Sequence, residues 1–209
     1  MTDEGYIKFS VHLNEMDIEM PNALSELNAV RTALFDIGMI GILPDGVGFG
    51  NVSIKVAGSE LFYISGTATG GKRILDIQDY CRVDACSAER NEVQCTGRIR
   101  ASAETLSHDA AYRANPEIGC VIHVHHKPFF LKLLQSTCPA TAPDAAYGTP
   151  EMAHAIEAIV KAHETPEGIL VMTGHEDGVI AWGKTVAETY DVLLGLANGT
   201  EPAKIPPCS

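Results

Sequence analysis

The apolar residues of this chain recur with two different periods, which predict two kinds of element. In some segments they return every three or four positions, the spacing that places them on one face of a helix. In other segments they alternate with polar residues or form short β-branched runs, as in strands. Helices are expected over residues 22–37, 102–112, 128–135, 149–163 and 184–197. Strands are expected over residues 52–56, 61–65, 120–127, 168–172 and 178–182, with two more between residues 72 and 100.

The order of these elements bears on the fold class. Several predicted strands follow one another without an intervening helix, as 61–65 follows 52–56, and such hairpins produce antiparallel pairs. The pattern therefore predicts a mixed or antiparallel sheet covered by helices on both faces, not a doubly wound parallel sheet. We expect one domain over residues 1–209, with residues 1–20 as an edge strand or arm and residues 200–209 as a flexible tail.

Composition narrows the class of protein further. The chain has 209 residues, of which 45% are apolar and 20% are charged, the balance of a globular protein. Its 15 basic and 27 acidic residues give a net charge of −12, which argues against nucleic acid or an anionic membrane surface as the main partner. A local site for an anionic small molecule remains compatible with this charge.

Other features of the sequence indicate a cytoplasmic protein with no membrane partner. No apolar run approaches the roughly 18 residues of a membrane span. The N-terminal residues lack the basic and apolar regions of a signal peptide. The six cysteines include no C-x-x-C pair, and we interpret them as reduced thiols rather than as zinc ligands.

The clearest chemical signal is the predicted strand CVIHVHHK at residues 120–127. Side chains alternate along a strand, so His123 and His125 point to one face and His126 to the other. Two imidazoles that converge in this way form half or more of a transition-metal site.

Two further segments carry residues suited to such a site. Ser102 is expected to cap a helix whose first turn contains Glu104, and His108 then lies on the same face one turn later. An ordinary exposed Glu–His pair is the alternative interpretation. His175 stands in the polar sequence TGHEDG between two apolar strands.

Two Gly-rich stretches, residues 46–51 and 65–71, are candidates for an anion-binding cradle. Gly-rich turns bring backbone N–H groups close to a ligand, and neighbouring hydroxyl and amide side chains add donors. Either stretch could equally be a simple turn.

Together these motifs resemble the class II aldolase/adducin family. The resemblance runs from about residue 23 to residue 197 and depends on the order and spacing of several motifs. The motifs are G-N-V-S at 50–53, S-x-E at 102–104, His108, Tyr112, Pro116, I-H-V-H at 122–125, Gly148-Thr149 and T-G-H-E-D-G at 173–178. The resemblance implies a three-layer α/β/α sandwich around a mostly antiparallel sheet. It also implies a homotetramer with sites at the subunit interfaces.

The resemblance assigns roles to individual residues. The zinc ligands would be His123, His125 and His175, and the catalytic base would be Glu104 with His108 behind it. Three imidazoles also suit other divalent metals such as Mn²⁺ or Co²⁺. The substrate and phosphate-binding residues would be Asn51, Ser65, Gly66, Thr67 and Ser102.

The implied activity is that of a metal-dependent aldolase. Such a lyase cleaves or forms a C–C bond in a small hydroxy-carbonyl compound, expected here to be a sugar phosphate, through a metal-stabilised enediolate. The alternatives are an epimerase, a dehydratase or a decarboxylase on the same scaffold, and a non-catalytic adducin-like module.

Three departures from the sugar-phosphate aldolases of the family concern the substrate. Ala103 and Gly48 stand where those aldolases carry hydroxyl donors to phosphate. Only 22 residues separate His125 from Gly148, a shorter link than in aldolases whose tyrosine acid lies in that segment. The metal site therefore looks complete, whereas the substrate-binding part and the proton donor have changed.

Overall fold

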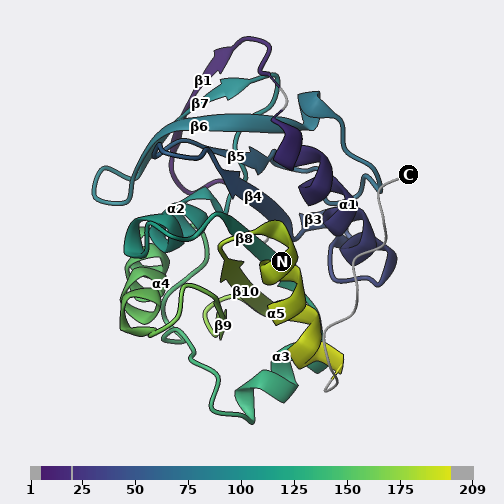
Figure 1. Cartoon of the computed structure of the whole chain (residues 1–209), viewed down its shortest axis with the longest axis vertical. Helices are drawn as coiled ribbons and strands as arrows, with labels where there is room; N and C mark the ends of the chain where they lie inside the picture. Colours follow the sequence, from purple (N-terminus) through teal and green to yellow (C-terminus); the bar gives the residue numbers. More distant parts are fainter. Residues whose placement is uncertain (1–5, 20, 199–209) are drawn as a thin grey trace.

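A single eight-stranded sheet forms the middle layer of the protein (Figure 1). The structure is a computed structural model in which residues 6–19 and 21–198 are described. The strands lie in the order β1 (Ser10–Glu15), β7 (Glu92–Gly97), β6 (Tyr80–Ser87), β5 (Phe62–Ser65), β4 (Asn51–Lys55), β8 (Cys120–His125), β10 (Gly178–Gly183) and β9 (Gly168–Val171). Neighbours are antiparallel except at one edge, where β1 runs parallel to β7. The short strands β2 (Gly41–Ile42) and β3 (Gly48–Phe49) pair separately.

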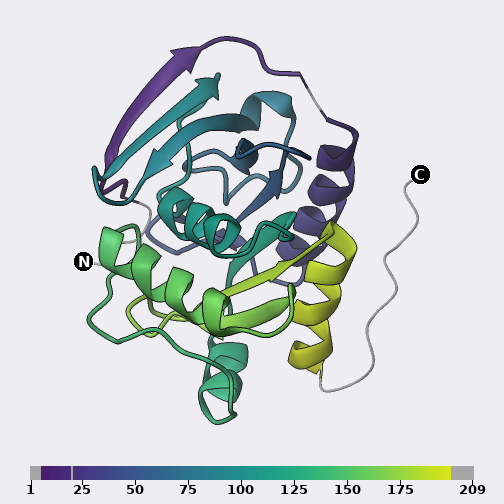
Figure 2. The same ribbon diagram turned by 60° about the vertical axis from the view of Figure 1, so that its left-hand side comes forward.

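Helices cover both faces of this sheet (Figure 2). Helices α1 (Asn22–Asp36) and α5 (Val186–Asn198) lie on one face, and α2 (Thr105–Ala114) and α4 (Pro150–Ala162) on the other. Helix α3 (Lys127–Leu134) lies near the β9 edge. The predicted three-layer α/β/α sandwich around a mostly antiparallel sheet is thereby confirmed.

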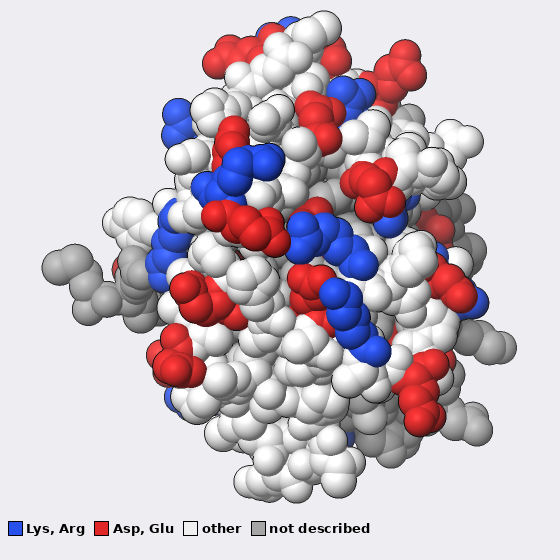
Figure 3. Space-filling view, turned by 90° about the vertical axis from the view of Figure 1, so that its left-hand side faces the viewer, with Lys and Arg blue, Asp and Glu red and all other residues white. Residues whose placement is uncertain are grey.

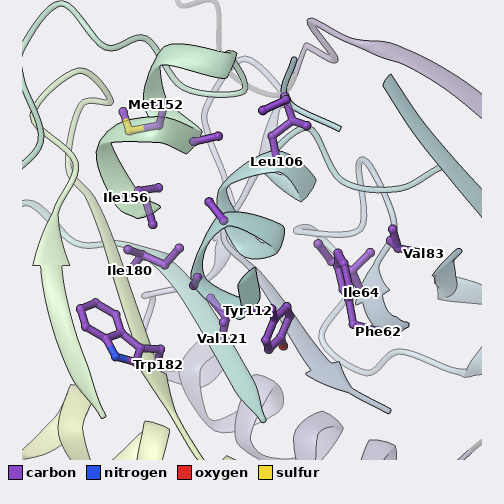
Figure 4. Packing of buried hydrophobic residues seen from close by; sticks show 14 of the residues in the cluster. Phe62, Ile64, Val83, Leu106, Tyr112, Val121, Met152, Ile156, Ile180 and Trp182 are labelled. Atoms are coloured by element: carbon purple, nitrogen blue, oxygen red, sulfur yellow. The ribbon is translucent and has the colours of Figure 1, made fainter. Parts of the chain in front are cut away.

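The sheet separates two apolar clusters, because successive side chains of a strand point to opposite faces. Val121 contributes to the cluster under α2 and α4, whereas Ile122 and Val124 contribute to the cluster under α1 and α5. Figure 4 shows the first cluster, in which Tyr112 lies beside Phe62. The alternation along β8 therefore places His123 on the face covered by α2.

Two predicted details differ in the structure. Helix α2 begins at Thr105 with Glu104 at its N-cap, about two residues later than expected, because Ser102 caps a turn of its own. The Ser102 carbonyl accepts from the Thr105 N–H at 3.1 Å, and its hydroxyl accepts from the Glu104 N–H at 3.3 Å. Leu134 of α3, which helical periodicity places on the apolar side with Leu133, is 42% exposed.

The ends of the chain and its surface complete the picture. Residues 10–15 form an edge strand, which is one of the two forms expected for residues 1–20, the other being an arm. The expected tail at 200–209 lies outside the described residues. No helix among residues 6–19 and 21–198 combines the length and apolar character that crossing a bilayer requires. Acidic and basic side chains are interspersed on the face shown in Figure 3. Arg113 forms ion pairs with Asp109 and Glu157.

Candidate metal centre and its surroundings

The structure brings together the three histidines that the sequence nominated. His123 and His125 come from β8, and His175 lies in the turn just before β10, the strand hydrogen-bonded to β8. One ligand atom from each of the three lies within 4.8 Å of the others, and the Nε2 atoms of His123 and His125 are 2.9 Å apart. Three imidazole nitrogens thus converge on one point.

Hydrogen bonding and burial prepare these rings to bind a cation. His123 Nδ1 lies 3.1 Å from the Val179 carbonyl oxygen, so this nitrogen donates its proton there and Nε2 keeps a free lone pair. Burial, and then the neighbouring imidazoles, lower the pKa of His123 well below its usual value. Neutral imidazoles are the form that binds metal, and His125 is only half-buried, which leaves a side open. The donor set therefore fits a divalent transition metal.

A tight turn presents His175 to this cluster. The Met172 carbonyl accepts from the His175 N–H at 2.9 Å, and the His175 carbonyl accepts from the Gly178 N–H at 3.0 Å. A side chain at Gly178 would place its Cβ 3.2 Å from the His175 ring and 3.3 Å from the His123 ring. Glycine at this position therefore leaves room for the two imidazoles to approach one another.

The segment that precedes α4 is joined to the His175 turn. The Thr173 N–H donates to the Thr141 hydroxyl at 3.1 Å, and the Thr173 hydroxyl donates to the Thr141 carbonyl. A Cβ on Gly174 would stand only 1.8 Å from the Ala145 carbonyl oxygen, so the two backbones are in direct contact. Tyr147 then stacks on His175, with ring centres 4.6 Å apart.

Glu104 lies where a proton-transfer group for this centre is needed. Its side chain is buried, and its Oε1 atom is 3.4 Å from His175 Nδ1. Its Oε2 atom accepts a hydrogen bond from the Ser107 hydroxyl at 2.7 Å. Ser107 was not identified from the sequence, although its position three residues after Glu104 on a helix was a usable signal.

His108 lies one helical turn after Glu104, and its ring is hydrogen-bonded to β4. Its Nδ1 atom bonds to the Ser53 hydroxyl at 2.7 Å, and its Nε2 atom has no hydrogen-bond partner among the described residues. Burial lowers the pKa of His108 to about 3, so the ring is neutral. A supporting role of His108 behind Glu104 remains a prediction, and the hydrogen bond that orients Glu104 comes from Ser107.

Most of the predicted substrate-binding residues surround a small cavity beside the imidazoles. Asn51 is paired with His123 across β4 and β8, and it is 8% exposed. The cavity, of about 30 Å³, is lined by Gly48–Asn51, Gly66–Gly70, Ser102–Glu104 and Tyr147. Ser65 lies outside this lining, because its hydroxyl accepts from the Val52 N–H at 3.1 Å. The volume suits about one water molecule.

A buried arginine from α1 supports this cavity from behind, and it was not identified from the sequence. Arg31 is 1% exposed, and its guanidinium donates to the carbonyls of Thr69, Gly70 and Arg73 at 3.0, 3.3 and 2.9 Å. These bonds fix the direction of the loop carbonyls. In helical periodicity alone, Arg31 beside Val30 and Leu34 resembles any polar residue on an amphipathic helix.

A larger cavity opens onto the imidazoles. It has a volume of about 420 Å³, and its walls include Phe49, His125, Tyr147 and His175. Another cavity of about 500 Å³ lies at the opposite end of β4, near Lys55 and Lys184, and its lining contains no histidine. We therefore assign the chemistry to the cavity of about 420 Å³ beside the imidazoles. His126 caps α3 by accepting from the Phe129 N–H at 3.3 Å, and the cluster does not include it.

Known structures show the fold of this chain in other proteins. An L-fuculose-1-phosphate aldolase from Thermus thermophilus superimposes with a TM-score of 0.61 and 19% identity, over 86% of this chain and 97% of that one. A sugar-phosphate aldolase from Thermotoga maritima gives a TM-score of 0.56 and 14% identity, over 84% of this chain and 90% of that one. At these identities the likeness establishes the fold alone.

Sequence relatives add to this likeness. A methylthioribulose-1-phosphate dehydratase from Leptospira interrogans is 37% identical over 79 residues, which are 36% of this chain and 31% of that protein. The protein of the same name from Geobacillus kaustophilus is 36% identical over 76 residues, 36% of this chain and 34% of that protein. The match thus spans about a third of the length of these curated relatives.

The family is established by a longer match. The model of the class II aldolase and adducin N-terminal domain matches residues 45–201. The chain therefore belongs to the class II aldolase/adducin family.

Proposed function

We propose that this protein is a metal-dependent lyase that acts on a small hydroxy-carbonyl compound. The observation that carries the proposal is the position of Glu104, whose buried carboxylate lies 3.4 Å from one of the three clustered imidazoles. A non-catalytic module has no need of an acid–base group at a candidate metal centre. The pairing of the two favours an enzyme over an adducin-like scaffold.

His123, His125 and His175 would hold the metal. When bound, a divalent ion would supply a Lewis acid that draws negative charge onto a substrate oxygen. Glu104 takes a proton from the substrate or returns one, while the Ser107 hydroxyl holds the other carboxylate oxygen in place. Tyr147, stacked on His175, forms one wall of the opening and limits the access of water.

Carbon–carbon cleavage is the reaction we put first. In the retro-aldol direction, the proton of a substrate hydroxyl leaves, the neighbouring C–C bond breaks, and the electron pair passes to the carbonyl fragment. A carboxylate within reach of the substrate hydroxyl can accept that proton and return it to carbon. Glu104 has the required burial and position for both transfers.

Dehydration is the second candidate, and sequence identity favours it. The two relatives described above are named as methylthioribulose-1-phosphate dehydratases. Elimination of water needs the same two elements, a base that removes a proton next to a carbonyl and a Lewis acid on the oxygen. Because both reactions would use the same base and the same Lewis acid, product analysis has to decide between them.

We further propose that the substrate carries a phosphate, bound near Asn51, Thr67 and Ser102. The cavity of about 30 Å³ there is too small for a phosphate group, so binding requires the loops around Gly48 and Gly70 to separate. A phosphorylated substrate should therefore order these loops in a new position. We also propose a homotetramer with the site at a subunit interface, which light scattering of the purified protein would test.

Metal analysis combined with a substrate screen tests the function. The purified protein should bind one divalent metal per chain, and the metal-loaded form should cleave or dehydrate at least one substrate. The panel should include L-fuculose 1-phosphate, methylthioribulose 1-phosphate and their unphosphorylated forms, each with Zn²⁺, Mn²⁺ and Co²⁺. A chain that takes up no divalent metal would overturn the proposal and would favour a non-catalytic, adducin-like scaffold.

A further inference from the structure

A chain of hydrogen bonds crosses the apolar core next to the imidazole cluster. The Ser53 hydroxyl of β4 lies 2.7 Å from His108 Nδ1 and 2.7 Å from the Tyr112 hydroxyl, both on α2. The three side chains are 0%, 0% and 2% exposed. Polar groups are costly in such a place unless their hydrogen bonds are satisfied, so the direction of each proton matters.

The contacts favour one direction. If Tyr112 donates to Ser53 and Ser53 donates to His108 Nδ1, both hydroxyl protons are accepted. In every other arrangement a hydroxyl proton is left without an acceptor among the described residues. The favoured arrangement places the imidazole proton of His108 on Nε2.

The position of the ring shows which way this N–H faces. Ser53 and Asn51 lie two residues apart on β4 and share one face, and Asn51 is paired with His123. Glu104 precedes His108 by one turn of α2, and Tyr112 follows it by one turn. The ring thus lies between the Ser53–Tyr112 pair and the end of the sheet that carries His123. Since Nδ1 faces Ser53, the opposite ring nitrogen, Nε2, is expected to face the end of the sheet that carries His123.

Two buried atoms at this end have no hydrogen-bond partner among the described residues. They are His108 Nε2, a donor in the favoured arrangement, and Asn51 Oδ1, an acceptor. Buried polar atoms are normally satisfied by a protein group or by a bound molecule, so a bound oxygen atom would complete these two. A hydroxyl group is suited to this, because its oxygen accepts from one atom and its proton is donated to the other.

We propose that Ser53 and Tyr112 are positioning residues that hold His108 as a fixed, neutral Nε2–H donor to a substrate oxygen at the imidazole cluster. The proposal rests on the lyase function proposed above, because it assigns the donor to that substrate. A neutral donor stabilises charge that develops on the oxygen without adding a second cation beside the metal. Burial, which lowers the pKa of His108 to about 3, keeps the ring in this neutral form across the working range of pH.

Nitrogen NMR on the wild-type protein provides the first test. Labelled His108, assigned by the loss of its signals in His108→Gln, should show a protonated Nε2 and an unprotonated Nδ1. The pattern should persist from pH 8 down to about 5 and in both metal-free and metal-loaded protein. A proton on Nδ1 would overturn the proposal even for an enzyme with full lyase activity.

Substitutions then separate positioning from simple stability. Ser53→Ala removes the donor to Nδ1, so His108 should become a mixture of tautomers and kcat should fall roughly ten-fold, the loss of about one hydrogen bond. Metal content and KM should change little. Tyr112→Phe should have the same effect to a smaller degree, because the Ser53 hydroxyl remains.

Matched controls exist for both substitutions. Tyr80→Phe also removes a buried tyrosine hydroxyl, one that contacts Asn28 at 3.4 Å, and Ser87→Ala removes a buried serine hydroxyl at the end of β6. Neither should move the His108 signals or kcat. If the controls lowered kcat as much as Ser53→Ala did, the effect would be structural and the proposal would be wrong.

Replacing the histidine itself gives an independent check. The amide nitrogen of His108→Gln can stand near the original Nε2, whereas that of His108→Asn stands near Nδ1. His108→Gln should therefore keep more activity than His108→Asn, and the reverse order would overturn the proposal. Absence of metal binding together with an Nε2–H tautomer would overturn the lyase function and leave the hydrogen-bond chain supported.

Discussion

The imidazole cluster and the Gly-rich cavity beside it lie side by side, yet they are built from different parts of the chain. The cluster is made of side chains from a central strand and one short turn, and an opening of about 420 Å³ leads to it. The cavity is made mainly of backbone from two loops, and only about 30 Å³ of it is empty. On the function proposed above, metal binding would depend on side-chain identity, whereas the fit of the substrate would depend on loop conformation.

The most damaging change should be the loss of a cluster histidine. In His123→Ala, two imidazoles remain and a buried space replaces the third, so metal affinity and activity should both be lost, with activity reduced by at least about 10⁴-fold. Metal content by mass spectrometry and turnover of the screened substrate measure this. His154→Ala, an exposed histidine on α4, should leave both unchanged. Full metal binding by His123→Ala would mean that the cluster is not the metal centre.

The next largest effect is expected from Glu104→Gln, which should impair the chemistry without impairing metal binding. Glu104→Gln keeps the shape of the side chain and removes its basicity, so metal content should stay the same while kcat falls by about 10²–10⁴-fold. Single-turnover measurements with the metal-loaded protein provide the test. Glu151→Gln, at an exposed position in the first turn of α4, serves as the control. Normal turnover by Glu104→Gln would exclude it as the base.

A third change acts on the Gly-rich cavity alone. Arg31→Met removes the donors to three loop carbonyls, so the loop should loosen and the free energy of unfolding should fall by about 2 kcal/mol. The KM for a phosphorylated substrate should rise about ten-fold while metal content stays constant. Arg73→Met removes only an exposed ion pair with Asp36 and should cost less than about 1 kcal/mol. An equal rise in KM for both variants would remove the distinction between the two regions.

The smallest effect concerns His108, which belongs to neither region. Its folded-state pKa of about 3 lies below the value of about 6.5 in an unfolded chain. Between these values only the unfolded chain binds the proton, so the stability that the neutral ring contributes is complete above pH 6.5 and is lost as the pH falls. From pH 7 to pH 5, metal-free wild-type protein should lose about 2 kcal/mol more unfolding free energy than His108→Gln. Denaturant titrations at the two values measure this, and equal losses would show that the ring is not kept neutral.

Sequence reasoning succeeded where periodicity and spacing carry the information. The two-residue period of β8 placed His123 and His125 on one face, and the hairpin order gave the antiparallel sheet. Sequence reasoning had less success with contacts between elements that are far apart along the chain. Neither the Arg31 bonds to loop carbonyls nor the approach of Ser53 to His108 follows from local pattern, because each joins residues about 40 or 55 positions apart.

The site was predicted in part for the same reason. The proximity of His175 to β8 came from family resemblance, since no local rule brings a turn before β10 next to a strand fifty residues earlier. Ser65 shows a further limit, because the sequence does not reveal which backbone group bonds to a hydroxyl in a Gly-rich stretch. In the structure the Ser65 hydroxyl accepts from the Val52 N–H and the cavity lining begins at Gly66, so a binding role of Ser65 stays a prediction.

The contact of Gly174 with Ala145, together with the Thr141–Thr173 hydrogen bonds, has a mechanical consequence. The link that follows α3 and the turn that carries His175 behave as one lever, because neither backbone can shift without displacing the other. An insertion or deletion near residue 140 would therefore displace the His175 imidazole as well as the wall formed by Tyr147. A change in this link that reshapes the opening would therefore also have to keep the His175 imidazole in place.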